Sequence, residues 1–138
     1  MGYLIDTNIW SEMQKGARTN PGVKRWFATV TGEDLFLSVL VIGEVRRGIE
    51  CLRRRDPEQA TQLEQRLSQL KTAMNGRILT VSPAIAERWG KMNAPDPLPV
   101  IDGLLAATAL EHNLILVTRN VRDIERSGVR WLNPFALV

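Results

Sequence analysis

Cysteine and histidine are nearly absent from this chain of 138 residues, in which Cys51 and His112 are the single examples. One cysteine cannot form an internal disulfide, so the composition suits a reducing compartment. One cysteine and one histidine also cannot build a zinc site from the usual sulfur and nitrogen ligands. We therefore expect a cytoplasmic protein whose fold depends on its hydrophobic core, without disulfides or zinc.

Long hydrophobic runs and glycine-rich nucleotide motifs are also missing. No apolar run approaches the roughly 18 residues that would span a membrane, and no basic segment followed by an apolar one resembles a secretion signal. The motifs GxGxxG, GxxxxGK(S/T) and GxSxG do not occur, which argues against nucleotide-binding loops and a serine-hydrolase site. If the protein is an enzyme, carboxylates remain as its catalytic groups, and their oxygens suit Mg²⁺ or Mn²⁺.

The overall composition is that of an ordinary globular protein. Hydrophobic residues make up 44% of the chain and charged residues 24%. A chain of 138 residues is long enough to bury a self-standing core, so we expect one domain over residues 1–138. The net charge of +3 permits an anionic partner such as nucleic acid but does not require one.

Short apolar segments alternate with amphipathic ones along the chain. The apolar segments predict strands at residues 3–5, 35–38, 77–81, 114–118 and 129–132. The segments between them predict helices at residues 8–15, 21–30, 39–55, 57–75, 83–94 and 100–113. The alternation predicts a three-layer α/β/α fold with a mostly parallel central sheet of about five strands. Residues 56–75 lie outside the alternation, and we expect them to form a polar, detachable helical arm that protrudes from the domain.

Four acidic residues occur at or shortly after the ends of predicted strands, or in the first turn of a predicted helix. They are Asp6, Glu44, Asp102 and Asp123. In a parallel sheet with short crossovers, the carboxyl ends of the strands and the starts of the following helices share one edge, where such folds bind ligands. The pattern therefore predicts that these carboxylates converge. The alternative is that they are separate helix caps and surface acids, because Asp6 with Thr7 and Asn8 also fits a helix start.

Electrostatics decides what such a convergence would mean. Two carboxylates about 4 Å apart repel each other by roughly 4 kcal/mol at an effective dielectric constant near 20. A domain is stable by only about 5–15 kcal/mol, so a cluster of acids needs relief from arginines, from protonation or from a cation. Arg119 and Arg122 are near enough in sequence to relieve Asp123 alone. A divalent metal ion would relieve the whole group and would also supply a catalyst.

Four segments together resemble a known family. "YLIDTNIWSE", "LSVLVIGEVRRGIE", "LPVIDGLLAATAL" and "LVTRNVRDI", in this order, look like a PIN-domain ribonuclease, and more narrowly like the VapC/FitB toxins of bacterial toxin–antitoxin pairs. The resemblance runs over essentially the whole chain and includes the closing "WLNPF". No single motif is specific, but the ordered set of four is. Two positions depart from the family pattern: Val41, where many relatives have a hydroxyl residue, and Ile124, where phenylalanine is frequent.

The resemblance implies a PIN-like fold and a role for each acid. It makes Asp6, Glu44, Asp102 and Asp123 the catalytic acids, with Asp6 and Asp102 as metal ligands and Glu44 and Asp123 as further or water-mediated ones. The implied supporting residues are Thr7, Asn8, Thr118 and Asn120. It further implies one or two Mg²⁺ or Mn²⁺ ions, an RNA substrate, a cognate antitoxin and a homodimer, within a larger toxin–antitoxin assembly. Val41 is expected to loosen the support around Glu44.

Contacts with RNA are less well defined by the sequence. Arg46 and Arg47 follow Glu44 closely and could track phosphates or face an antitoxin, although a solvated helix face explains them equally well. Trp10 could stack on a base near the site, although the four tryptophans more often act as core or interface anchors. Glu12 fits either a supporting acid or a surface position.

Two other functions are compatible with parts of this pattern. A non-catalytic PIN-like module in complex with a DNA-binding partner would keep the fold, but it would not need four converging acids. A phosphoacceptor receiver domain also pairs acids beside the aspartate at a strand end. That class requires a lysine after a late strand, where this chain has Arg119 in "LVTRN". The leading hypothesis is therefore a metal-dependent endoribonuclease toxin.

Overall fold

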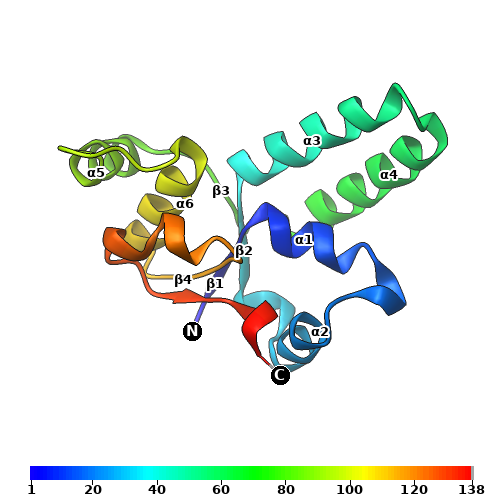
Figure 1. The fold of residues 1–138 in the computed structure, drawn as a ribbon, viewed down its shortest axis with the longest axis horizontal. Helices are drawn as coiled ribbons and strands as arrows, with labels where there is room; N and C mark the ends of the chain where they lie inside the picture. Colours follow the sequence, from blue (N-terminus) through cyan, green and yellow to red (C-terminus); the bar gives the residue numbers. More distant parts are fainter. Residues whose placement is uncertain (138) are drawn as a thin grey trace.

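A sheet of five parallel strands, in the order β3-β2-β1-β4-β5, forms the centre of the computed structural model, which describes residues 1–137 (Figure 1). The strands are β1 (Tyr3–Ile5), β2 (Leu35–Ser38), β3 (Ile78–Leu79), β4 (Ile115–Val117) and β5 (Trp131–Leu132). Every neighbouring pair is parallel, and Tyr3 of β1 lies level with Leu35 of β2 and Ile115 of β4. The expected α/β fold with a parallel sheet of about five strands is confirmed, although β3 and β5 are shorter than predicted.

Six α-helices connect the strands, and each corresponds to a predicted helix. They are α1 (Thr7–Met13), α2 (Pro21–Thr29), α3 (Val39–Arg53), α4 (Pro57–Ala73), α5 (Pro83–Met92) and α6 (Val100–Glu111). Short 3₁₀ turns are η1 (Gly16–Arg18), η2 (Gly32–Asp34), η3 (Val121–Asp123), η4 (Glu125–Ser127) and η5 (Pro134–Ala136). None of the helices in residues 1–137 is both long and apolar enough to cross a lipid bilayer.

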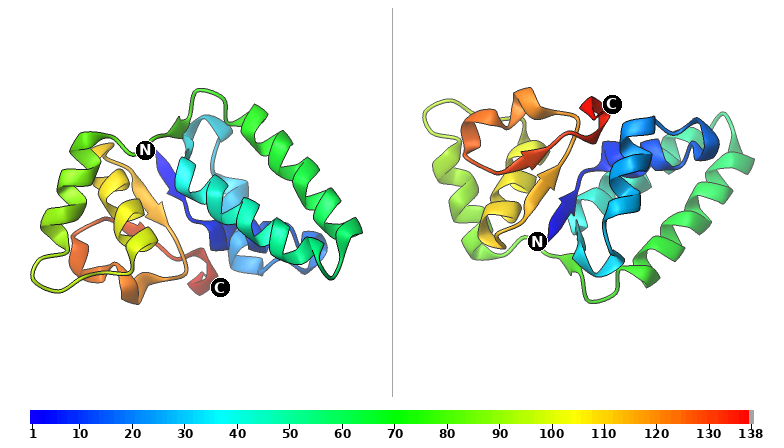
Figure 2. Two further views of the ribbon diagram at one scale, coloured as in Figure 1. Left: turned by 90° about the horizontal axis from the view of Figure 1, so that it is seen from above. Right: turned by 90° about the horizontal axis from the view of Figure 1, so that it is seen from below.

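The strand order reverses direction between β1 and β4, and this reversal positions the site. From β1 the chain winds outwards through β2 and β3, and then it crosses back to β4 and β5. Helices α1–α4 therefore lie on one side of the sheet, and α5 and α6 lie on the other (Figure 2). In open parallel sheets, a crevice forms at the carboxyl ends of the two strands where the order reverses.

Five of the six helices begin with a side-chain cap that the sequence supplies directly after a strand or a turn. Asp6 caps α1, and the other caps are Asn20 for α2, Ser38 for α3, Asp56 for α4 and Ser82 for α5. Each accepts a hydrogen bond from a backbone N–H of the first turn, which would otherwise have no partner within the helix. Such caps fix where each helix leaves the edge of the sheet.

The predicted helical arm is anchored rather than detachable. Helix α4 packs along α3, and the two extend together away from the sheet (Figure 1). Ala60 and Leu67 on α4 and Met74 at its C-cap are at most 5% exposed and belong to the same hydrophobic core as Leu4 and Leu37 of the sheet. The tip of the α3–α4 hairpin protrudes, as expected, but its inner face is part of the core.

Candidate active site

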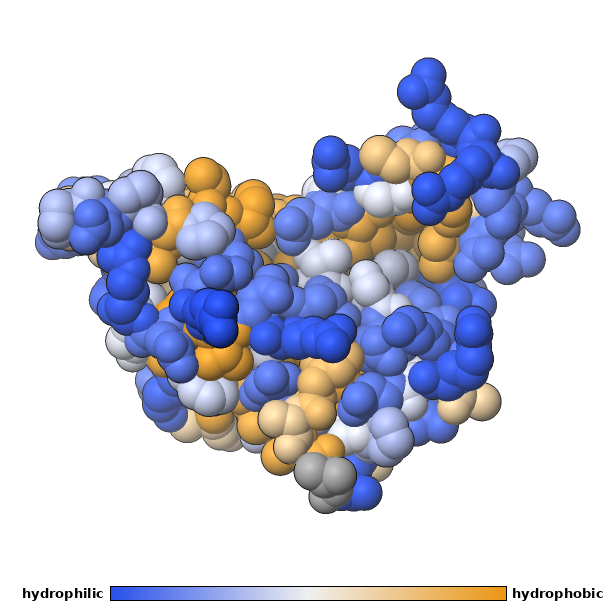
Figure 3. Space-filling model, in the orientation of Figure 1, coloured by the Kyte–Doolittle hydropathy of each residue, from blue (hydrophilic) through white to orange (hydrophobic). Residues whose placement is uncertain are grey.

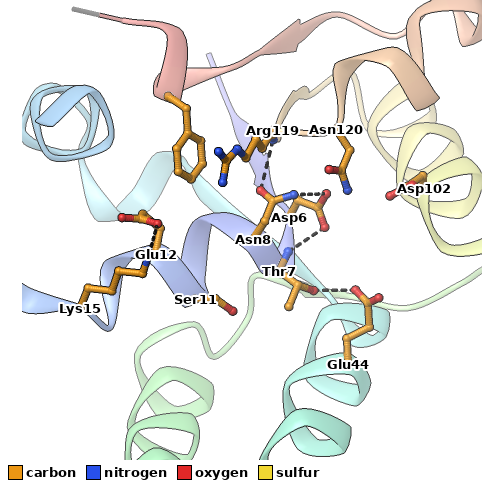
Figure 4. A pocket seen from close by; sticks show the side chains of 11 residues that line it. Asp6, Thr7, Asn8, Ser11, Glu12, Lys15, Glu44, Asp102, Arg119 and Asn120 are labelled. Carbon is orange, nitrogen blue, oxygen red and sulfur yellow. Dashed lines mark hydrogen bonds and ion pairs between the residues drawn. The ribbon is translucent and has the colours of Figure 1, made fainter. Parts of the chain in front are cut away.

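A cavity of about 420 Å³ opens at the point where the strand order reverses. One end is acidic, and the other carries two cationic side chains and an aromatic ring (Figure 4). Its lining residues are Asp6, Thr7, Asn8, Ser11, Glu12, Lys15, Glu44, Asp102, Arg119, Asn120 and Phe135. Segments separated by more than 100 residues thus meet at the carboxyl ends of β1 and β4.

Asp6 is at once a helix cap and a buried member of the site. It follows β1 directly, is 4% exposed, and caps α1 by accepting a hydrogen bond from the backbone N–H of Thr7 at Oδ1 (2.7 Å). Its Oδ2 accepts hydrogen bonds from Thr118 Oγ1 (2.7 Å) and Asn8 Nδ2 (3.2 Å). Burial raises the pKa of Asp6, and these three hydrogen bonds partly offset that increase. Capping and site membership, treated above as alternatives, therefore occur together.

Thr118 and Asn8 hold this end of the site rigid. Besides donating to Asp6, the Thr118 hydroxyl accepts hydrogen bonds from Asn120 N (3.0 Å) and Asn8 Nδ2 (3.4 Å). A hydroxyl has one proton and two lone pairs, so its hydrogen-bonding capacity is fully used. The side-chain oxygen Oδ1 of Asn8 accepts a hydrogen bond from Arg119 N (3.2 Å), which ties the loop after β4 to α1. All four predicted supporting residues, Thr7 included, thus lie within or beside the cavity.

Glu44 reaches the site from the second turn of α3. Its Oε1 accepts a hydrogen bond from Thr7 Oγ1 (2.6 Å), so Thr7 joins two of the acids, one through its backbone and one through its hydroxyl. Val41 is fully buried in the core and lines a separate apolar groove. Val41 has no hydroxyl that could support Glu44, and Thr7 supplies this support instead.

Asp102 lies in the first turn of α6, where Pro99 is the cap position and makes no side-chain capping bond. Its pKa is raised to about 6, mainly because the carboxyl is partly buried and then because of the negative charges of Asp6, Asp123 and, more weakly, Glu44. The side-chain amide of Asn120, which points towards Asp102 in Figure 4, partly offsets this increase. Asp123 in η3 does not line the cavity, but its charge acts on Asp102.

No cation neutralises these acids within the described part of the chain. The ion pairs of residues 1–137 involve other carboxylates, and Asp6, Glu44, Asp102 and Asp123 take part in none of them. Nor do these residues include a group of three His, Cys, Asp or Glu side chains arranged to hold one ion. Mg²⁺ typically takes one or two carboxylates and completes its shell with water and substrate phosphate. The donor set fits such a hydrated ion, and not an all-protein cage.

Four lining residues were not expected from the sequence: Ser11, Lys15, Arg119 and Phe135. Helical spacing could have found Ser11, which lies four residues after Thr7 on the same face of α1, whereas Lys15 follows the end of that helix. Glu12, also on α1, is 8% exposed, so the surface position considered for it is wrong. No spacing rule predicts the approach of Arg119 to Phe135, because both lie in irregular segments near the ends of β4 and β5.

The structure places the three weaker candidates for RNA contact, Trp10, Arg46 and Arg47, in different surroundings. Trp10 does not line this cavity but an apolar groove of about 230 Å³ between α1, α2 and α4, and its contact with RNA stays a prediction. Arg46 donates hydrogen bonds to Glu50 (3.1 Å) and to Glu64 (2.6 Å). These bonds link α3 to α4 and occupy the guanidinium group of Arg46. Arg47 is exposed beside Glu44 and stays a prediction.

The tryptophans divide between core and surface. Trp26 is 5% exposed and meets Tyr3 edge to face, with 5.6 Å between ring centroids, and Trp10 and Trp89 are half-buried. Trp131 on β5 is 44% exposed, so it is not a core anchor. As the outermost strand, β5 has a free edge there, which explains this exposure.

Comparison with known proteins identifies the class to which this fold and site belong. The PIN domain family matches residues 3–128, so the chain belongs to the PIN domain family. The toxin FitB of Neisseria gonorrhoeae is 28% identical over 96% of this chain and 97% of its own length. The VapC ribonuclease Y4jK of Sinorhizobium fredii is 27% identical over 96% of each chain. The structure of FitAB bound to the IR36 DNA fragment contains a chain that superimposes with a TM-score of 0.89 and 27% identity, covering 99% of this chain and 97% of that one.

Proposed function

We propose that this protein is a metal-dependent endoribonuclease, the toxin of a type II toxin–antitoxin pair, that hydrolyses RNA phosphodiesters in the cytoplasm. Residues 1–138 would act as a single PIN domain. The similarity to FitB and to a VapC ribonuclease supports the class of activity. The observation that carries the proposal is the meeting of Asp6 and Asp102 in one cavity, where neither carboxylate forms an ion pair with any side chain of residues 1–137.

Asp6 and Asp102 are the side chains that would hold Mg²⁺ or Mn²⁺, with Glu44 and Asp123 acting through water or as further ligands. When bound, such an ion supplies Lewis-acid stabilisation of the phosphate charge and makes water a better nucleophile. The chain itself contributes fixed geometry, because both oxygens of Asp6 are hydrogen-bonded and cannot rotate freely. Thr7 keeps Glu44 directed at the same space.

The proposed partners follow from the surface. Trp10, Met13, Phe27 and Leu70 line the apolar groove between α1, α2 and α4, and hydrophobic side chains are visible in the hollow between α1 and the α3–α4 hairpin in Figure 3. An antitoxin segment with an apolar face would fit this groove. Val39 and Val100 are 37% and 59% exposed near the acidic site, and they favour a homodimer.

Incubation of the purified protein with total RNA tests the activity. We expect cleavage in millimolar Mg²⁺ or Mn²⁺ and none in EDTA. Asp102→Asn removes the charge of a proposed ligand while keeping the shape, so its cleavage should fall by orders of magnitude. Asp96→Asn, which removes an exposed acid in the loop before α6, is the matched control and should cleave like the wild type. Cleavage that persists in EDTA, or in Asp102→Asn at the wild-type rate, contradicts the proposal.

One observation favours a second candidate function. The FitAB structure has DNA bound, and its superimposed chain has nearly the same length as this one. A non-catalytic module that serves within such a DNA-bound complex would therefore keep the same fold. This candidate predicts no RNA cleavage under any metal condition, together with DNA binding that requires the partner and is unchanged in Asp102→Asn.

A further inference from the structure

We propose that Arg119, stacked on Phe135 and flanked by Lys15, holds the RNA phosphate next to the one at the acids, and so fixes how the strand lies in the cavity. The inference rests on the proposed ribonuclease function and specifies the substrate site. It replaces Arg46 and Trp10, which face other parts of the molecule, as the residues that contact RNA.

The geometry of Arg119 leaves its hydrogen-bond donors available. Its Cζ lies over the Phe135 ring, 4.6 Å from the ring centroid, in a cation–π contact. The planar guanidinium fork can donate two N–H groups to two phosphate oxygens at once. Within residues 1–137 the Arg119 side chain has neither an ion pair nor a hydrogen bond. An arginine beside several acids would ordinarily pair with one of them, and the stacking on Phe135 holds it apart.

The charges divide the cavity into two ends. Asp6, Glu44 and Asp102 lie at one end, where an RNA phosphate would require a metal ion. At the other end Glu12 faces two cations: Lys15 Nζ lies 2.9 Å from Glu12 Oε1, and Lys15 and then Arg119 lower the pKa of Glu12. One negative and two positive groups leave this end with a net positive charge. An anionic strand can therefore continue from the acids towards Arg119.

The C-terminal turn is placed so that Phe135 reaches this end. Asn133 caps η5 by accepting a hydrogen bond from Phe135 N (3.1 Å), and η5 packs on α2. Gly22 permits this approach, because a Cβ at position 22 would overlap the carbonyl oxygens of Pro134 and Leu137. Phe135 is thus a positioning residue for Arg119, carried by a turn that α2 holds in place.

Binding of a fluorescein-labelled single-stranded RNA to the full chain in EDTA tests the proposal without relying on cleavage. Arg119→Ala should weaken binding about tenfold to a hundredfold, as expected for a charge-assisted bidentate contact. It should also reduce the slope of log K against log[salt] by about 0.7, the value for one phosphate contact on a single strand. Arg119→Lys should keep the slope and lose part of the affinity, because the charge remains without the planar fork.

Two further variants separate this role from a general effect of charge or folding. Arg55→Ala removes an exposed arginine at the tip of the α3–α4 hairpin, far from the cavity, and should change affinity less than twofold (Figure 1). Phe135→Leu keeps apolar volume but removes the ring, so it should weaken binding about threefold to tenfold with the slope unchanged. Thermal melts of each variant show that the fold persists. Equal losses in Arg119→Ala and Arg55→Ala, or no loss in either, overturn the proposal, as does a wild-type protein that does not bind RNA.

Cleavage then locates the phosphate. Single phosphates of an RNA substrate are replaced in turn by neutral methylphosphonates. At one position beside the cut, this replacement should slow cleavage by the wild type about tenfold. The same replacement should not slow Arg119→Ala, because that variant has already lost the contact. If the losses from the methylphosphonate and from Arg119→Ala multiply at every position, Arg119 and that phosphate act independently, which overturns the proposal. RNA binding through Arg119 without any cleavage would contradict the ribonuclease but support this site. Cleavage by Arg119→Ala at the wild-type rate and with wild-type affinity would support the ribonuclease but contradict this site.

Discussion

Replacing Asp102 by asparagine should stabilise the metal-free protein. The pKa of Asp102 is raised from an ordinary 3.8 to about 6, a difference of roughly 2 units. At 1.36 kcal/mol per unit this corresponds to about 3 kcal/mol, and because the carboxyl is partly exposed, solvent screening reduces it to about 1–2 kcal/mol. For a chain of this length, such a gain raises Tm by roughly 4–8 °C. Asp102 is a cleaner position than Asp6, whose carboxylate also caps α1.

The pH dependence of the difference follows from the direction of the shift. In the folded protein Asp102 keeps its proton to a higher pH than in the unfolded chain, so ionisation opposes folding. The penalty is absent below the unfolded pKa near 3.8, grows as pH rises towards 6, and is complete above 6. The Tm of the wild type should therefore fall relative to that of Asp102→Asn as pH rises from 4 to 7, and the gap should be constant above pH 7.

Thermal melts at pH 4 to 8, in EDTA and in Mg²⁺, measure both effects. At 100 times its dissociation constant, Mg²⁺ should stabilise the wild type by about 2.7 kcal/mol, and Asp102→Asn should gain much less. Asp96→Asn serves as the control and should follow the wild type in every condition. A variant Asp102→Asn that melts at or below the wild type in EDTA at pH 8, with an undiminished Mg²⁺ shift, would refute the reasoning that Asp102 is strained by its neighbours.

Three further substitutions test the framework around the site, each by chemical denaturation. Thr118→Val removes the hydroxyl that donates to Asp6 and should destabilise the fold by about 1–3 kcal/mol, because a buried carboxylate oxygen loses a partner. Gly22→Ala should cost about 1–3 kcal/mol, since the added methyl overlaps the Pro134 carbonyl, whereas a cost near zero would mean that the turn is free to move. Ser38→Ala removes the cap of α3 and should cost about 0.5–2 kcal/mol.

The sequence was a reliable guide wherever local chemistry determines structure. Apolar segments and capping residues such as Asn20 and Ser38 marked the strands and helix starts to within a few residues. The parallel alternation then brought Asp6, Glu44 and Asp102 to one cavity, because strand ends in such a sheet share an edge. Asp123 in η3 lies outside the cavity lining, and its charge acts on Asp102.

The contacts that the sequence did not reveal depend on how helices and loops pack against each other in the folded protein. Arg46 seemed available for phosphate, but its partner Glu64 lies on a different helix and becomes a neighbour only after α4 packs on α3. Trp10 follows Asp6 closely, yet the rotation of about 100° per residue turns it off the face of α1 that lines the cavity and towards the apolar groove. The stacking of Arg119 on Phe135 joins two irregular segments, for which no periodic pattern exists.

Cleavage of an RNA that carries a phosphorothioate at its mapped cut site tests the central claim most directly. If a metal ion held by Asp6 and Asp102 contacts the scissile phosphate, sulfur should slow the Mg²⁺ reaction by at least tenfold, and Mn²⁺, which tolerates softer ligands, should restore most of the rate. The account predicts this restoration in the wild type and no cleavage with either ion in Asp102→Asn. Equal slowing in Mg²⁺ and Mn²⁺, or cleavage that survives EDTA, would contradict it.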